Sequence, residues 1–368
     1  MLSVQCTNCN QAYPDTGVPY RCPVCGGLFD FSGMLHYRPD RIEPDLPGIW
    51  RYRHTFGFPQ EYELISLGEG STPLVWDRVL GAQVAFKCEY LNPSGSFKDR
   101  GSALIASFLR GRGAQAALED SSGNAGASLA AYAARAGIQL RVFIPEAASG
   151  PKRAQIQAYG AEVVQIMGPR SNASAAVRQA AEKGDIYASH AYLPYNLPGY
   201  ATLAYELYEQ LGEAPGSVIL PVGQGGLILG IARGFEGLKH LGLVERVPVL
   251  VGVQARACAP LWALTSFGTA GLAWVAEAQT MADGIRVYHP VRGDAVMQAV
   301  STSRGRFVAV DEEDISTGGE QLAQRSFYVE PTSAVVWSGL AQGVGEIPEP
   351  IVVILTGSGL KSNRLSVQ

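Results

Sequence analysis

The sequence predicts an α/β protein with two domains whose open, twisted sheets are mostly parallel, preceded by a small cysteine-rich segment. Three observations support this prediction. The chain has 368 residues, which is long enough for two domains with large buried cores. Apolar runs typical of strands alternate with helical stretches, a pattern that favours parallel sheets covered by helices. Four of the cysteines lie close together near the start of the chain.

The composition excludes several classes of protein. Hydrophobic residues make up 47% of the chain and charged residues 17%, as in an ordinary globular protein. The net charge of -4 argues against a nucleic-acid partner, which would need a basic surface. No apolar run approaches the ~20 residues that span a bilayer, and residues 1–5 do not resemble a signal peptide. We therefore expect a cytoplasmic protein with no membrane partner.

The first four cysteines have the spacing of a zinc site. They are Cys6, Cys9, Cys22 and Cys25, in the pattern Cys-x2-Cys-x12-Cys-x2-Cys. Two such pairs can place four thiolates tetrahedrally around one zinc ion and leave no open position, which indicates a structural ion. Asn10 and Gly26 follow the two pairs and tolerate the left-handed backbone that these turns need. The alternative is two disulfides, which a cytoplasmic chain disfavours.

A proline- and charge-rich connector, Arg38–Gln60, separates this segment from the alternating part of the chain. Predicted strands are Val84–Tyr90, Ala114–Glu119, Leu140–Pro145, Glu162–Ile166, Ser217–Pro221, Val249–Val253, Phe307–Val310 and Ile351–Leu355. Predicted helices are Ser102–Leu109, Ala127–Ala136, Ser174–Lys183, Thr202–Leu211, Leu227–Leu241 and Ile315–Phe327. Cys88 and Cys258 lie in apolar stretches, so we expect them to be buried and inert.

Loops of small residues follow three of the predicted strands. They are Ser121-Ser122-Gly123-Asn124, Val222-Gly223-Gln224-Gly225-Gly226 and Thr356-Gly357-Ser358-Gly359. Ligands of open α/β sheets bind beyond the carboxyl ends of the strands. One such loop alone would be a plain turn, but three at strand ends indicate a binding site.

The second loop is predicted to bind a phosphate group. It leads directly into an apolar helix, whose N-terminal N–H groups and positive dipole attract an anion. It is not a dinucleotide fingerprint, because Ile228 stands where the third glycine would be. It is not a Walker loop either, because no Lys-Ser or Lys-Thr pair follows.

Lys98 lies between the turn Asn92–Phe97 and the apolar helical run that starts at Ser102. A lone lysine is more often a surface residue, but this position can direct it into a crevice. A buried lysine loses proton affinity, and its free amine can attack an aldehyde. An amine together with a phosphate-binding loop predicts pyridoxal 5'-phosphate (PLP), which carries both an aldehyde and a phosphate.

With these residues in view, the chain resembles the tryptophan-synthase-β-like (fold type II) PLP enzymes, and within them the threonine synthase group. The motifs that carry the resemblance are 66–74, 92–101, 121–124, 221–226, 282–285, 329–334 and 356–361. The resemblance implies a zinc ribbon at 1–30, a large PLP-binding domain at 31–75 and 196–368, and a small domain at 76–195. It also implies a homodimer and a small amino-acid substrate.

The resemblance implies a role for each site residue. Lys98 would bind the cofactor covalently and act as general base and acid. Asn124 would contact the pyridine ring hydroxyl, and Thr356 the pyridine nitrogen. Ser121, Ser122 and Gly123 would bind the substrate carboxylate, although the serines could instead cap a helix. The cofactor phosphate would lie on Gly223, Gln224, Gly225, Gly226 and Leu227. The implied reaction converts O-phospho-L-homoserine to L-threonine and phosphate.

The chain departs from the threonine synthase pattern at three positions. Asn196, Ala201 and Ala125 stand where the family has Arg, Lys and Thr. A substrate phosphate is expected to need charge-assisted donors. Residues that could replace the missing cations are Lys152, Arg153, Arg170 and His190.

Two other functions remain open on these residues. One is a β-eliminating ammonia-lyase or β-replacement synthase acting on threonine, serine or a β-substituted amino acid, which needs no second phosphate site. The other is a zinc-ribbon binding protein on a degenerate enzyme scaffold, which the presence of Lys98 and Asn124 makes the weaker alternative.

Overall fold

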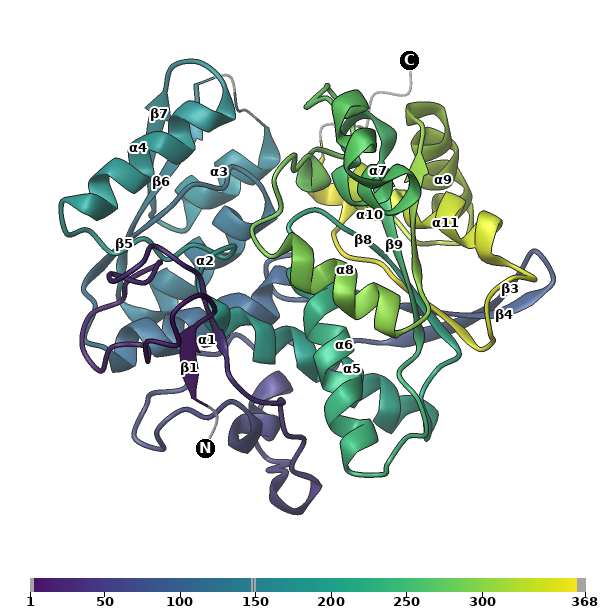
Figure 1. Ribbon diagram of the computed structural model, residues 1–368, viewed down its shortest axis with the longest axis horizontal. Helices are drawn as coiled ribbons and strands as arrows, with labels where there is room; N and C mark the ends of the chain where they lie inside the picture. Colours follow the sequence, from purple (N-terminus) through teal and green to yellow (C-terminus); the bar gives the residue numbers. More distant parts are fainter. Residues whose placement is uncertain (1–2, 147, 149, 363–368) are drawn as a thin grey trace. The chain divides into compact units, whose positions relative to one another are not determined.

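The structure is a computed structural model that describes residues 3–146, 148 and 150–362 (Figure 1). The chain forms two compact units, and each is described by itself. Unit 1 comprises Met1–Gly70 and Lys98–Gly199, and unit 2 comprises Ser71–Phe97 and Tyr200–Gln368. The predicted α/β class with mostly parallel sheets is confirmed. Every strand predicted from the sequence is present, within a few residues, as one of β4–β11.

The domain division predicted from the sequence remains a prediction, and it differs from the two units in three segments. Residues 31–70 lie in unit 1, residues 76–97 lie in unit 2, and residues 196–199 lie in unit 1. The second difference has a simple cause, because β4 (Ala82–Lys87) pairs in parallel with β11 (Ile351–Ile354). The outermost residues of that division, 1–2 and 363–368, lie outside the described part of the chain.

Unit 1 contains a parallel sheet in the order β5-β6-β7. Its strands are β5 (Ala116–Glu119), β6 (Gln139–Pro145) and β7 (Glu162–Ile166). Its helices are α1 (Lys98–Gly111), α2 (Asn124–Ala136), α3 (Pro151–Ala158) and α4 (Arg170–Glu182). The alanine-rich α2 is a strong helix former, and it ends where Gly137 adopts a left-handed conformation, with φ of 67°.

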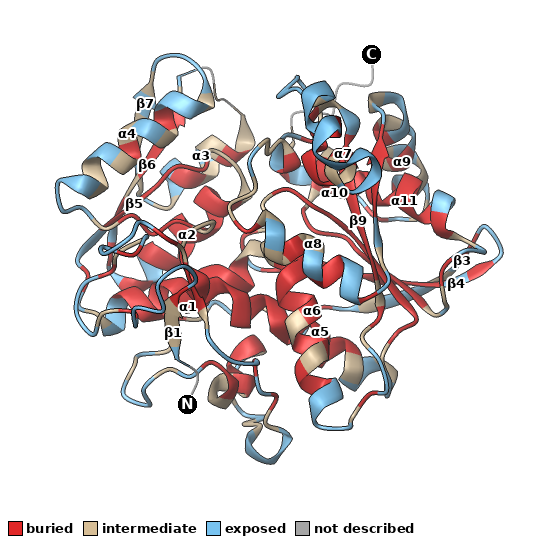
Figure 2. Ribbon diagram, in the orientation of Figure 1, coloured by how far each residue is buried: buried red, intermediate tan, exposed pale blue. Residues whose placement is uncertain are grey.

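The two faces of this sheet are covered by different helices. Leu118 and Phe143 pack with Ala173 and Val177 of α4. Successive side chains of a strand point to opposite faces, so the buried Val142 faces the other side, where α2 packs against β6, α1 and α3. Buried residues run along most of α1 and α2 in Figure 2.

The cysteine segment belongs to unit 1 and contains a two-stranded antiparallel sheet, β1 (Val4–Cys6) and β2 (Phe29–Phe31). Its aromatic side chains pack on the segment 187–196. The ring of Tyr20 lies 5.2 Å from that of Tyr187 and 5.3 Å from that of Tyr192. The ring of Tyr13 lies 5.3 Å from that of Tyr195.

Unit 2 contains a six-stranded sheet in the order β10-β9-β8-β11-β4-β3, parallel except for the antiparallel pair β3–β4 at one edge. Its remaining strands are β3 (Leu74–Val79), β8 (Ser217–Pro221), β9 (Val249–Ala255) and β10 (Arg306–Val310). Its helices are α5 (Leu197–Leu211), which begins in unit 1, α6 (Gly226–His240), α7 (Pro260–Phe267), α8 (Gly293–Thr302), α9 (Glu312–Gln324), α10 (Pro331–Ala334) and α11 (Val336–Gly343). The strands β8 and β11 are buried along their whole length, as expected for a sheet covered on both faces.

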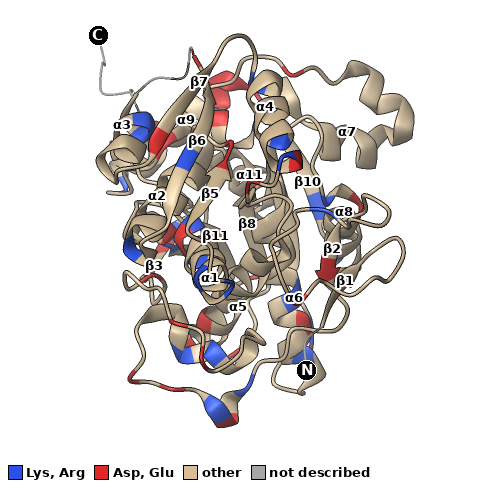
Figure 3. Ribbon diagram, turned by 90° about the vertical axis from the view of Figure 1, so that its left-hand side faces the viewer, with Lys and Arg blue, Asp and Glu red and all other residues tan. Residues whose placement is uncertain are grey.

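Acidic and basic residues are interspersed along the ribbon in Figure 3 rather than gathered on one element. Among the described residues, no helix is both long enough and apolar enough to cross a membrane. As predicted, Cys88 and Cys258 are buried, and burial raises the pKa of each thiol to about 11.

Candidate active site

Lys98 is the first residue of α1 and is half-buried. Burial lowers the pKa of its amine from 10.5 to about 8, because the charged form is poorly solvated there. The carboxylate of Glu119 acts in the opposite direction and raises the pKa, whereas Arg170 lowers it further. The amine is therefore uncharged more often near neutral pH than that of an exposed lysine, which suits attack on an aldehyde.

Hydrogen bonds attach the start of α1 to α2. Ser128 Oγ donates to Asp99 Oδ1 at 2.6 Å and lies 2.7 Å from Ser102 Oγ, with which it shares a second hydrogen bond. All three residues are buried. They hold the first turn of α1, which carries Lys98, beside the first two turns of α2.

The loop Ser121–Gly123 connects β5 to α2. Gly123 occupies the N-cap position of α2, and no side chain caps this helix, so the serines do not have the capping role considered from the sequence. The Oγ of Ser121 accepts a hydrogen bond from the N–H of Gly123 at 3.3 Å. A Cβ atom at Gly126 would collide with the Ser121 carbonyl oxygen, so the helix needs glycine there. The loop therefore lies tightly against the N-terminus of α2, where N–H groups can bind a carboxylate.

Two acidic residues that lie outside the predicted motifs immediately precede this loop. Glu119 is fully buried, and its Oε1 lies 2.9 Å from Nδ1 of His190. Asp120 accepts hydrogen bonds from the Tyr187 hydroxyl at 2.8 Å and from Ser174 Oγ at 2.5 Å. Two adjacent acidic residues at the end of an apolar strand could have indicated these positions from the sequence, because buried charges are rare unless they are paired or have a function.

The positions where cations were expected are buried and carry no charge. Asn196 is 2% exposed, and its amide donates a hydrogen bond to the carbonyl oxygen of His190 at 2.6 Å. Ala201 is fully buried. Of the residues considered as replacements, Arg170 is close enough to Lys98 to lower its pKa, and His190 pairs with Glu119. The side chain of Arg153 donates to the Ala148 carbonyl oxygen, and Lys152 is buried in α3.

In unit 2, the glycine loop lies between β8 and α6. Gly225 has a left-handed backbone, with φ of 79°, and a Cβ atom there would collide with Val296. A Cβ atom at Gly223 would lie 3.0 Å from the Cα atom of Ile285. Gln224 is held by the N–H of Val291, which donates to its Oε1 at 3.0 Å. The backbone of this loop is thus fixed at the N-terminus of a helix, in an arrangement that can bind a phosphate group.

Thr356 follows β11, the strand that pairs in parallel with β8. The carboxyl ends of these neighbouring strands lie at the same edge of the sheet, so Thr356 and the glycine loop share that edge. The N–H of Thr356 donates to Ser333 Oγ at 2.9 Å. Its Oγ1 is buried and has no hydrogen-bond partner among the described residues. A buried hydroxyl without a partner is unfavourable, so this atom fits one that contacts a bound group.

The four cysteine sulfurs all lie within 4.8 Å of one another. Asn10 and Gly26 have φ angles of 59° and 72°, the left-handed conformations predicted from the sequence. The N–H of Asn10 donates to the carbonyl oxygen of Cys6, and that of Gly26 to the carbonyl oxygen of Cys22. Each turn thereby directs two sulfurs toward one point, as a tetrahedral metal ion requires.

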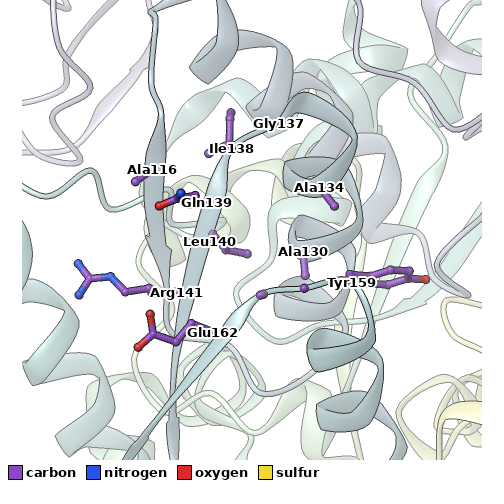
Figure 4. Close-up of a pocket in the computed structure, with 12 residues that line it drawn as sticks. Ala116, Ala130, Ala134, Gly137, Ile138, Gln139, Leu140, Arg141, Tyr159 and Glu162 are labelled. Atoms are coloured by element: carbon purple, nitrogen blue, oxygen red, sulfur yellow. The ribbon is translucent and has the colours of Figure 1, made fainter.

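A separate hollow in unit 1 does not belong to this site (Figure 4). It is lined in part by Ala116, Gln139, Tyr159 and Glu162. Ala116 begins β5, whereas Glu119 and the serine loop lie at the other end of that strand. The hollow is therefore remote from Lys98 and from the N-terminus of α2.

The chain is similar to a known family over most of its length. A family model described as pyridoxal-phosphate dependent enzyme matches residues 65–357. The threonine synthase of Methanocaldococcus jannaschii is 33% identical, with 99% of this chain and 94% of that protein covered. The threonine synthase of a Synechocystis species is 34% identical, with 87% of this chain and 84% of that protein covered.

Solved structures show the same fold. A threonine deaminase from the organism abbreviated T.th. has a TM-score of 0.65 and 28% identity, covering 78% of this chain and 92% of that chain. Maize serine racemase has a TM-score of 0.67 and covers 78% of this chain and 88% of that chain. At 22% identity, the second likeness concerns the fold alone.

Proposed function

This chain belongs to the family of pyridoxal-phosphate-dependent enzymes, and we propose that it is a threonine synthase-type lyase. The proposed reaction converts O-phospho-L-homoserine to L-threonine and phosphate. One observation carries this proposal: the threonine synthases of Methanocaldococcus jannaschii and a Synechocystis species match 99% and 87% of this chain, and the first match includes the cysteine segment.

Lys98 is the proposed cofactor-binding and catalytic residue. PLP supplies an aldehyde that binds amines and a ring that withdraws electrons from the substrate's α-carbon. The lowered pKa of Lys98 supports covalent binding to that aldehyde, because the uncharged amine is the nucleophile. Once a substrate amine has taken its place, Lys98 would move protons at the α- and β-carbons as general base and acid.

Other residues of the chain are also proposed to contact the cofactor. The loop Gly223–Leu227 would bind the phosphate, and its fixed glycine backbone at the start of α6 supports this role. Thr356 would face the pyridine nitrogen, which is consistent with the unsatisfied Oγ1. Asn124, the first residue of α2, would contact the ring hydroxyl.

The proposed substrate-binding residues are Ser121, Ser122 and Gly123. Because neither serine caps α2, their hydroxyls and the N–H groups at the start of the helix would be available to a substrate carboxylate. This arrangement would fix the amino acid beside Lys98, whose own helix is bonded to α2 through Ser128.

We propose a structural zinc ion on Cys6, Cys9, Cys22 and Cys25. Four thiol ligands suit a closed tetrahedral site, and the distances between the sulfurs support it. Thiolate ligands also agree with the reducing cytoplasm, which is the proposed location of the protein.

A homodimer is the proposed assembly.

One observation favours a second candidate function. Asn196 is bound to a backbone carbonyl and Ala201 is fully buried, so neither position offers a cation to a substrate phosphate. An ammonia-lyase or a β-replacement synthase acting on threonine, serine or a β-substituted amino acid would need no such cation.

The test is a paired assay of the PLP-loaded protein with O-phospho-L-homoserine, in which phosphate and threonine are measured in the same tube. The proposal predicts equal amounts of both products, and no product from Lys98→Ala. Phosphate without threonine, or no reaction at all, would contradict it. Ammonia and a 2-oxo acid formed from threonine or serine would then support the second candidate.

A further inference from the structure

Glu119 is a fully buried carboxylate of which only one oxygen is satisfied. Its Oε1 pairs with Nδ1 of His190, whereas Oε2 is buried without a hydrogen-bond partner among the described residues. Leaving a buried acceptor unsatisfied is unfavourable, and more so when the acceptor carries a charge. This cost points to a partner for Oε2 that binds during function.

The surroundings hold Glu119 in one orientation. The next residue, Asp120, is bonded to Tyr187 and Ser174. His190, the partner of Glu119, is held in turn by Asn196, whose side chain donates to the His190 carbonyl oxygen at 2.6 Å. Asn196 therefore has a structural role in this chain, because it fixes His190, which orients the Glu119 carboxylate.

Glu119 and Lys98 lie close enough to interact. The loop of residues 120–123 joins Glu119 to α2, and Ser128 of α2 is bonded to Asp99, the neighbour of Lys98. Among the charged groups that act on the pKa of Lys98, Glu119 of β5 raises it and Arg170 of α4 lowers it, so Glu119 stabilises the ammonium form. An ammonium in a poorly solvated position needs such an acceptor.

We propose that Glu119 is a positioning residue whose Oε2 accepts the protonated Lys98 amine whenever that amine is not covalently bound to the cofactor. The proposal rests on the proposed role of Lys98. A substrate amino group that took its place would release the amine, and the amine would become an ammonium on taking the substrate's α-proton. Glu119 would then hold this ammonium close to the N-terminus of α2, so that Lys98 can return the proton to the substrate.

The test measures the pH dependence of Lys98 reactivity in protein freed of PLP. The rate of labelling by an amine-acylating reagent is followed by mass spectrometry of the peptide that contains Lys98. We expect a midpoint of about 8 for the unaltered protein. We expect a midpoint about one pH unit lower for Glu119→Gln. For Glu119→Asp we expect an intermediate value, because the shorter side chain keeps the negative charge but places it farther from Lys98.

Asp120→Asn is the matched control, because it removes an adjacent negative charge that Tyr187 and Ser174 already satisfy. Its midpoint should stay at the unaltered value. Equal midpoints for the unaltered protein and both Glu119 variants would overturn the proposal. So would a shift in Asp120→Asn as large as that in Glu119→Gln. If Glu119→Gln does not fold, Glu119→Asp alone tests the proposal, and a midpoint equal to that of the unaltered protein would contradict it.

A second readout uses the loaded enzyme and whichever substrate it turns over. Glu119→Gln should lower kcat about tenfold or more with little change in KM, because it weakens proton transfer rather than substrate binding. The labelling result requires no substrate. Failure of this proposal is therefore distinguishable from failure of the threonine synthase assignment.

Discussion

At the scale of single residues, the hydroxyl of Thr356 is the clearest sign of a bound group. It is buried and has no partner in the described part of unit 2, although the N–H of the same residue is bonded to Ser333. A fold that needed only the shape of this side chain could use valine. The proposed contact with the cofactor would satisfy this hydroxyl.

Thr356→Val should leave folding intact and weaken PLP binding. The free energy of unfolding of the cofactor-free protein should stay the same or rise by about 1 kcal/mol, because an unsatisfied hydroxyl is removed. The dissociation constant of PLP should rise about tenfold through the lost hydrogen bond. Thermal unfolding and an absorbance titration with PLP measure the two effects.

Thr332→Val is the control for this variant. Its hydroxyl oxygen accepts from the N–H of Gly284 at 3.0 Å, so its removal should lower the free energy of unfolding by about 1 kcal/mol or more. A comparable loss of stability in Thr356→Val would mean that its hydroxyl has a structural role instead.

Residue-scale features were predictable from the sequence only where the signal was local. Lys98, the serine loop and the glycine loop each lie in a short stretch that can be read by itself. The pair of Glu119 and His190 joins residues 71 positions apart. No local pattern announces such a pair, because the fold alone brings these residues together.

At the scale of elements, the start of α6 requires glycine. Gly225→Ala should lower the free energy of unfolding by about 1–3 kcal/mol, because a left-handed backbone is strained for alanine and the new Cβ would collide with Val296. PLP binding should weaken further as the loop is displaced. Denaturant titration and the affinity for PLP check the two effects.

Gly242→Ala is the matched control. Gly242 has a similar φ of 71°, but no atom lies within 4 Å of the position that a Cβ would take there. This variant should show only the backbone strain, about 1–2 kcal/mol, with unchanged PLP affinity. An equal effect of both variants on PLP affinity would show that the loop is not a phosphate site.

A buried ion pair joins β4 to α5 in unit 2. Lys87 Nζ donates to Glu206 Oε2 at 2.7 Å, and the two side chains are 0% and 4% exposed. Lys87→Met should lower the free energy of unfolding by about 3–5 kcal/mol, because the Glu206 charge remains buried without its partner. The exposed pair of Arg256 and Asp311 provides the comparison.

Arg256→Met should cost less than about 1 kcal/mol, since solvent screens that pair. Denaturant titration measures both variants, and equal effects would contradict the stabilising role of the buried pair. The sequence predicted the strand that contains Lys87 but not this pair. A lysine at the end of an apolar run gives no indication of which distant carboxylate it meets.

At the scale of the whole chain, the cysteine segment is expected to stabilise the part of unit 1 that carries His190. Tyr13 and Tyr20 of this segment pack on Tyr187, Tyr192 and Tyr195, on either side of His190. Metal analysis should find one zinc per chain, because four cysteines form one site.

Removal of zinc by a chelator should increase amide hydrogen exchange in residues 187–196, because the packing partners of that segment lose their support. Exchange in the six-stranded sheet of unit 2 is the internal control and should not change. Unchanged exchange in 187–196 after complete zinc removal would show that the metal does not support this segment.

The architecture was predictable from the sequence to a large extent, because strand and helix periods and glycine loops are local. The assignment of segments to units was not. Residues 76–97 belong to unit 2 because β4 pairs with β11, more than 200 positions later. The edge strand β3 also escaped prediction, since Asp77 and Arg78 interrupt its apolar pattern.

The central claim is that Lys98 binds PLP covalently. Its most direct test is reduction of the PLP-loaded protein with borohydride, followed by digestion and mass spectrometry. We expect a pyridoxyl group on the peptide that contains Lys98 and none on other lysines, with loss of the label in Lys98→Ala. A label on a different lysine, or no stable label in protein that shows the cofactor's absorbance, would contradict the claim.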